Sequence, residues 1–119
     1  MPSKEEHIVK AEGSEGVADS IQPTSQARID WKLIVTFYAA MHYIEAYLAK
    51  ALNTHLRSHT TRDSWMVKES NLKKVATSYN HLKFYGYNAR YEVTTFGASD
   101  VTDAASYLTQ IKAALKPLL

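Results

Sequence analysis

Three side chains suited to acid/base chemistry share one side of a single predicted helix. Tyr38, His42 and Glu45 follow one another at i, i+4 and i+7, so they project from the same side of that helix. A carboxylate beside an imidazole can orient the ring and raise its pKa, which is one ingredient of general acid/base catalysis. His42 and Glu45 are therefore candidate catalytic residues. The alternative is structural: the two half-buried groups satisfy each other or bind a partner chain.

The segment directly after this helix is suited to binding phosphate. Residues 55–62, HLRSHTTR, hold two histidines and two arginines. A guanidinium binds phosphate oxygens bidentately, and a nearby imidazole can exchange a proton. His59 and Arg62 are thus further candidate catalytic residues, and Arg57 joins them as a candidate contact to nucleic acid or nucleotide. The alternative is that His59 and Arg62 hold the loop in place by capping helix ends or by pairing with Asp63.

Aromatic rings alternate with cations in the second half of the chain. The rings are Trp65, Tyr79, Phe84, Tyr85, Tyr87 and Tyr91, beside Lys83 and Arg90. Exposed rings among cations can stack on single-stranded bases. Helical spacing predicts Tyr79 in the core, whereas Tyr85, Tyr87 and Tyr91 are expected to be more exposed. Arg90 and Tyr91 are candidate nucleic-acid or nucleotide contacts, with burial in the core or an interface as the alternative for most of the rings.

The formal net charge of +2 conceals an uneven distribution along the chain. Residues 1–23 carry two Lys and five Asp or Glu, a net charge of −3, whereas residues 50–90 carry eight Lys or Arg and two Asp or Glu, a net charge of +6. An anionic partner is therefore expected at the middle third of the chain. The alternative is that most of its lysines form the solvated face of a helix.

Several functional classes are disfavoured by the composition. The chain of 119 residues has no cysteine, which excludes disulfides and thiolate metal sites. Neither an HExxH motif, nor zinc-ligand spacing, nor a glycine-rich phosphate loop is present, so we expect no metal and no cofactor. No apolar run reaches the roughly 18–20 residues of a membrane span, and the acidic N-terminus lacks a signal-like apolar region. We expect a single-domain cytoplasmic protein that does not enter a membrane.

Helical periodicity dominates the chain, and only YEVTTF, residues 91–96, alternates like a strand. We expect an all-α fold, a four- to five-helix up-and-down antiparallel bundle. The connection from Gly86 to the last helix is expected to be irregular. The helices are expected over residues 4–20; from a Ser25 cap to about residue 52; from a Thr60 or Thr61 cap to about residue 68; from a Ser70 cap to Gly86; and from a Ser99 or Asp100 cap through Leu115.

The helix through residues 31–52 is too apolar for one buried face. One predicted face points to the core and consists of Leu33, Phe37, Ala40, Met41, Ile44, Leu48 and Leu52. An adjoining face carries Trp31, Tyr38 and His42. We expect this second face to form either an interface with a partner subunit or a cleft shared with the basic loop.

The order of these parts resembles the HEPN superfamily, named for higher eukaryote and prokaryote nucleotide-binding domains. The resemblance rests on FYAAMHYIEAYLA (37–49), SHTTR (58–62), a helix with a central tyrosine, and NARY (88–91) before a closing helix. It implies a four- or five-helix bundle, commonly homodimeric, often linked to toxin–antitoxin or defence systems and to RNA or nucleotide binding. The positions that correspond to family segments are Tyr38, His42, His59, Arg62, Arg90 and Tyr91.

The chain departs from the motif of the catalytic members. Those members cleave RNA without metal through an arginine followed four to six residues later by a histidine, before the last helix. Here Arg90 is followed by no histidine, Arg57 precedes His59 by only two residues, and Arg62 is not followed by a histidine until His81. We therefore expect an RNA- or nucleotide-binding protein with absent or non-standard catalysis. The alternatives are a non-catalytic interaction subunit with a partner protein, or a metal-independent ribonuclease using His42 with Glu45 or His59 with Arg62.

Overall fold

Six α-helices make up the part of the chain that the structure describes. This computed structural model describes residues 2–53 and 59–119, with the backbone alone for residues 59 and 60. The helices are α1 (Lys4–Ser20), α2 (Gln26–Ala51), α3 (His59–Lys68), α4 (Ser70–Lys73), α5 (Ala76–Tyr91) and α6 (Ala98–Leu115), followed by the 3-10 turn Lys116–Leu118. No strand occurs in the described ranges. The all-α prediction is confirmed, and residues 91–96 form no strand.

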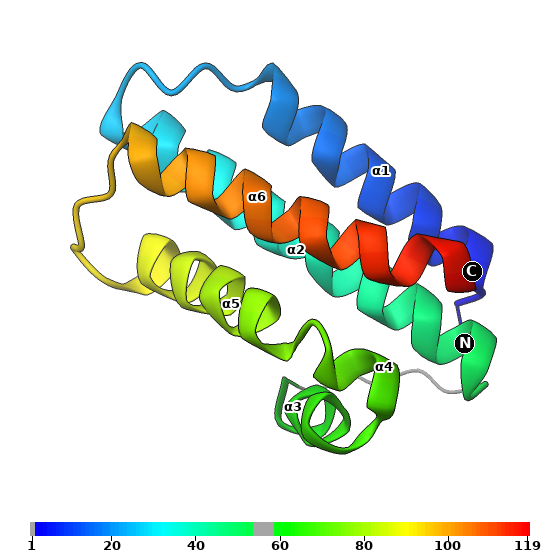
Figure 1. The fold of residues 1–119 in the computed structure, drawn as a ribbon. Coiled ribbons are helices and arrows are strands. Elements are labelled where there is room, and N and C mark those ends of the chain that lie inside the picture. The colour runs from blue at the N-terminus through cyan, green and yellow to red at the C-terminus, as the bar shows by residue number, and fades with distance from the viewer. Residues whose placement is uncertain (1, 54–58) are drawn as a thin grey trace.

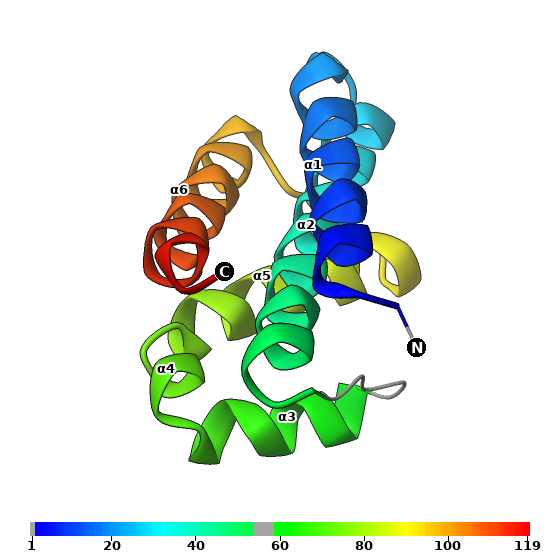
Figure 2. The same cartoon turned by 90° about the vertical axis from the view of Figure 1, so that its right-hand side faces the viewer.

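The four long helices form an antiparallel bundle. α1, α2, α5 and α6 alternate in direction along the bundle, and α3 and α4 lie together near one end of it (Figure 1). α2 packs against each of the other three long helices, while α6 lies against α2 and α5 (Figure 2). The start of α1 contacts the last residue of the chain, because Lys4 Nζ donates to the backbone oxygen of Leu119 at 2.9 Å. Among the helices described, none has the length and apolarity to traverse a bilayer.

The first two helices begin at serine caps. Ser3 and Glu6 form a reciprocal capping box, with both hydrogen bonds at 3.1 Å. At the start of α2 the predicted cap is confirmed, since Ser25 Oγ accepts from the backbone N–H of Arg28. The C-terminal end of α1 is held by Lys32 of α2, which donates to the carbonyl of Ile21 at 3.2 Å. These contacts, with the packing against α2, stabilise a helix that two glycines weaken.

The predicted core face of α2 is buried along most of its length. Its buried members contact residues of α5 and α6 in one hydrophobic cluster. Leu52 is the clearest departure, because it caps the end of the helix and is 37% exposed. The residues of this face with no exposed surface are Leu33, Phe37, Ala40, Ile44 and Leu48.

Gly86 does not end its helix, contrary to the prediction. α5 continues to Tyr91, and the irregular segment shrinks to residues 92–97. A Cβ atom on Gly86 would lie 2.7 Å from Cδ2 and 2.9 Å from Cγ of Phe37. The glycine is therefore explained by the close approach of α5 to α2, which leaves no room for a side chain.

The predicted helix over residues 70–86 is interrupted. It is divided at Lys74 and Val75 into the short α4 and the long α5. Ser70 is the first residue of α4 rather than its cap, because the Glu69 carboxylate accepts from the backbone N–H of Leu72 at 2.8 Å. The charged cap was missed because glutamate is an unusual N-cap residue.

Two further helix starts differ from the predictions. α3 is described from His59 onward, so Thr60 and Thr61 lie inside it rather than at its cap, and part of the predicted His/Arg loop is helical. The cap of α6 is Gly97. Asp100 is the third residue of α6, where its carboxylate accepts from the backbone N–H of Gly97 at 2.8 Å.

Candidate functional site

His42 is occupied in holding α1 against α2. Its Nδ1 atom lies 3.2 Å from Nδ1 of His7, and His7 is only 3% exposed. In such a pair one ring nitrogen donates and the other accepts. Burial lowers the pKa of the half-buried His42 imidazole, and His7 lowers it further, while the Glu45 carboxylate acts in the opposite direction. Part of the predicted interface face is thus covered by the first helix of the same chain.

Glu45 and Arg62 form a buried ion pair between α2 and α3. Nε and Nη2 of Arg62 each lie 3.0 Å from Oε1 of Glu45. Arg62 is 5% exposed and Glu45 is 2% exposed. One interpretation of the sequence paired Arg62 with Asp63, and it is wrong. Asp63 pairs with Lys83 of α5 instead. The structure therefore places Arg62 inside the bundle, with little surface for a phosphate ligand.

The remaining candidates of the His/Arg segment are placed only in part. His59 begins the described part of α3, and its side chain lies outside the described atoms. Arg57 lies outside the described residues altogether. Of the four candidate catalytic residues, the structure brings Glu45 into contact with Arg62. Both charges also act on the pKa of His42, one turn earlier on α2: Glu45 raises it and Arg62 lowers it.

Arg90 and Tyr38 join the C-terminal part of α5 to α2. Arg90 Nη1 donates to the Tyr38 hydroxyl at 3.0 Å, and Arg90 Nε donates to the carbonyl of Gly86 at 3.0 Å. The guanidinium carbon also lies 4.9 Å from the ring centre of Tyr91 and 5.6 Å from that of Tyr38. These cation–π contacts and hydrogen bonds hold the guanidinium between α5 and α2. Three predicted residues, Tyr38, Arg90 and Tyr91, thus form one constellation.

Three exposed rings line the outer side of α5, and we call them the α5 aromatic face. Phe84, Tyr87 and Tyr91 are 55%, 51% and 65% exposed. Tyr87 and Tyr91 lie one turn apart, and their ring centres are 5.1 Å apart. The predicted exposure of Tyr87 and Tyr91 is confirmed. Tyr85 was wrongly expected to be exposed: it points the other way, is 9% exposed and packs edge-on against Phe96. Tyr79 is fully buried, as predicted.

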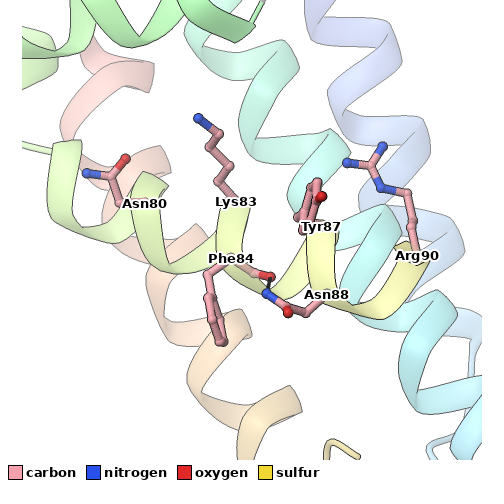
Figure 3. A pocket seen from close by; sticks show the side chains of 6 residues that line it. All are labelled: Asn80, Lys83, Phe84, Tyr87, Asn88 and Arg90. Atoms are coloured by element: carbon pink, nitrogen blue, oxygen red, sulfur yellow. Dashed lines mark hydrogen bonds between the residues drawn. The ribbon is translucent and has the colours of Figure 1, made fainter. Parts of the chain in front are cut away.

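A hollow of about 470 Å³ lies along the α5 aromatic face. Figure 3 shows Lys83, Tyr87 and Arg90 pointing to the same side of α5, with Phe84 directed away from them. Asn88 donates to the carbonyl of Phe84 at 2.8 Å, which positions its amide at the edge of the hollow. We call this the first hollow, and its lining residues are Asn80, Lys83, Phe84, Tyr87, Asn88 and Arg90.

Two members of this site, Asn80 and Asn88, were not identified from the sequence. Asn80 and Asn88 lie four residues before and four residues after Phe84, so a helix that continues past Gly86 places both on the same side as Phe84. The sequence contains this spacing, but it was not recognised because the helix was predicted to end at Gly86. Within the described ranges, no group of three or more His, Cys, Asp or Glu side chains is arranged to hold a metal ion.

Comparisons of the chain with protein-family models, with curated proteins and with solved structures give no match. The resemblance to the HEPN superfamily therefore rests on the sequence motifs alone.

Proposed function

We propose that this protein binds single-stranded RNA or a nucleotide through the α5 aromatic face and Arg90. The observation that carries the proposal is the combination of two exposed neighbouring rings, Tyr87 and Tyr91, with the Arg90 guanidinium beside Tyr91. Aromatic rings stack on bases of any identity, and an arginine fork complements a phosphate. The HEPN resemblance, which implies RNA or nucleotide binding and often a toxin–antitoxin or defence context, supports the same assignment.

The proposed site lies on α5 rather than on the His/Arg segment. Arg62 is 5% exposed and its guanidinium contacts Glu45, so moving it to a surface phosphate would leave a buried carboxylate without its cation. Arg90 and Lys83 line the first hollow. Lys83 is paired with Asp63, which leaves Arg90 as the principal cation of the site.

The proposal includes no cleavage step. His42 directs Nδ1 toward His7, and Glu45 directs its carboxylate toward Arg62, so both groups contribute to the packing of helices. A general base has to lie within hydrogen-bonding reach of the proton it removes. The first hollow offers rings, amides and cations, which suit binding.

A fluorescence titration with a short single-stranded RNA at two salt concentrations tests this function. We expect binding that weakens with salt, because phosphate contacts release counterions. Tyr87→Ala and Arg90→Ala should each weaken binding about tenfold, within the range for loss of one stacked base or a charged contact. Val93→Ala is the matched control, since Val93 is exposed just beyond α5. Absence of binding at low salt, or binding unchanged in Tyr87→Ala and Arg90→Ala, contradicts the proposal.

A second candidate function is a protein-interaction subunit, including a homodimer. It is favoured by exposed apolar residues on the outer side of α1 and α2: Val9 is 71%, Val17 50% and Trp31 60% exposed. Val9, Gly13 and Val17 also line a hollow with Val35 of α2. Exposed apolar patches of this kind mark interaction sites. If the partner is a second copy of the chain, light scattering after size exclusion should show an oligomer that dissociates in Val17→Asp, and a monodisperse monomer rules the homodimer out.

A further inference from the structure

A second hollow adjoins the proposed site, and Arg90 contributes to both. It measures about 230 Å³ and lies between the first turns of α2 and the end of α5. Ligand pockets of about 300–1,000 Å³ are typical, so the first hollow of 470 Å³ is large enough for a ligand and the second is too small to be a complete site. The second hollow therefore suits an extension of a ligand bound in the first. Its lining residues are Ala27, Asp30, Trp31, Ile34, Ala89 and Arg90.

Each hollow offers an aromatic surface to one base. Tyr87 and Phe84 line the first hollow and are about half exposed. Trp31 lines the second and is 60% exposed. Indole and phenol rings are both effective platforms for stacking on a base. The two platforms come from different helices, α5 and α2, with Arg90 between the two hollows.

The charges around the two hollows favour a phosphate at Arg90, which lines both of them. The contacts described for Arg90 use two of the five N–H donors of a guanidinium, those to Tyr38 and Gly86. Lys83, the other cation of the first hollow, is paired with Asp63. The second hollow contains the carboxylate of Asp30, which accepts from Gln26 Nε2 at 2.9 Å and would repel a phosphate. Arg90 is thus the position at which a phosphate between two bases is best accommodated.

We propose that the minimal ligand of this protein is a two-base unit of single-stranded RNA. One base stacks against Tyr87 in the first hollow, the second stacks on Trp31, and the phosphate that links them contacts Arg90. This inference rests on the proposed function and adds to it the ligand length and the role of Trp31. A mononucleotide, in contrast, fills only one hollow.

Calorimetric titrations of AMP and of the dinucleotide ApA test the inference at one salt concentration. ApA should bind about tenfold tighter than AMP, because a second base stacks. Trp31→Ala should remove that advantage while leaving the affinity for AMP within about twofold. An ApA analogue with an uncharged methylphosphonate linkage should also lose most of the advantage. Val93→Ala is the control and should retain it.

The outcomes separate this inference from the function on which it rests. If AMP and ApA bind equally well, the two-base inference is overturned and nucleotide binding stands. If Trp31→Ala weakens AMP and ApA by the same factor, Trp31 does not hold a second base, and the inference is again overturned. If AMP, ApA and longer RNA all fail to bind at low salt, the proposed function itself is wrong.

Discussion

Arg62 and Glu45 form an ion pair that ties α3 to α2 in the interior of the protein. Two guanidinium nitrogens of Arg62 each lie 3.0 Å from the same carboxylate oxygen of Glu45, and the two residues are 5% and 2% exposed. Removing either partner leaves the other charge buried, which typically costs about 3–5 kcal/mol. We expect Arg62→Ala and Glu45→Ala each to lower the free energy of unfolding by about that amount, as measured by urea denaturation.

Two further variants distinguish the ion pair from a general loss of packing. The double variant Glu45→Leu with Arg62→Met removes both charges and should lose less stability than either single alanine variant, because neither group is left buried and uncompensated. Arg28→Ala, at an exposed position near the start of α2, should change stability by no more than about 0.5 kcal/mol. Single alanine variants at Arg62 and Glu45 that remain as stable as the wild type would show that the pair contributes little.

The contact between His7 and His42 predicts that stability falls in mild acid. Burial and His7 lower the pKa of His42 in the folded state, whereas an unfolded histidine titrates at about 6.5. The unfolded chain therefore takes up the proton first as the pH falls. The stabilising contribution is complete above about pH 6.5 and is lost as the pH falls from there toward the lowered folded-state pKa. Lys10 and Arg62 act in the same direction as His7, and Glu45 opposes them.

Urea denaturation at pH 7.5 and pH 5.5 measures this effect. The wild type should have a lower midpoint at pH 5.5, and His42→Gln should show a smaller difference between the two pH values. His81→Gln is a matched control, because His81 lies on α5 and stacks on Tyr107 instead. An unchanged pH dependence in His42→Gln would mean that the His7–His42 contact is not its source.

Gly86 should tolerate no side chain, unlike the glycines of α1. A Cβ atom there would meet three atoms of Phe37 at 2.7–3.0 Å, including its Cβ. Overpacking of this kind costs about 1–3 kcal/mol, which exceeds the gain of up to about 1 kcal/mol from replacing glycine with alanine in a helix. We expect Gly86→Ala to lower the thermal midpoint. Gly13→Ala, where no atom lies within 4 Å of the new Cβ, should raise it, and a higher midpoint for Gly86→Ala would contradict the close crossing.

The sequence was sufficient to predict the fold and the core face of α2. Apolar spacing along residues 33–48 is strong enough to determine which side of that helix is buried. Helix ends were less predictable. Gly86 was interpreted as a helix terminator from its local sequence, but a glycine is needed there because Phe37, 49 positions earlier in the chain, lies too close for a side chain. A pattern within one helix carries no information about how closely another helix crosses it.

The polar residues of the candidate site show the same limit. Helical spacing placed His42 and Glu45 on one side of α2, but their partners, His7 and Arg62, lie 35 and 17 positions away. A sequence motif cannot distinguish a buried arginine from one that faces a ligand, because burial depends on residues that are distant in the sequence. The neighbours of Tyr87 and Tyr91 predicted their exposure correctly, but the same reasoning failed for Tyr85, which packs against Phe96 and is 9% exposed.

Tyr38→Phe should weaken RNA binding without unfolding the protein. The Tyr38 hydroxyl accepts a hydrogen bond from Arg90 Nη1 at 3.0 Å, whereas its ring packs against the core and remains in the variant. Losing the hydroxyl removes one of the two hydrogen bonds that hold the Arg90 side chain, and ordering a loosened side chain on binding costs about 0.5–1.5 kcal/mol. We therefore expect RNA affinity to fall roughly two- to tenfold, with a thermal midpoint close to the wild type. Tyr107→Phe on α6 is the matched control and should bind normally. If Tyr38→Phe retains full affinity while Arg90→Ala does not, Arg90 binds RNA without needing Tyr38 to position it.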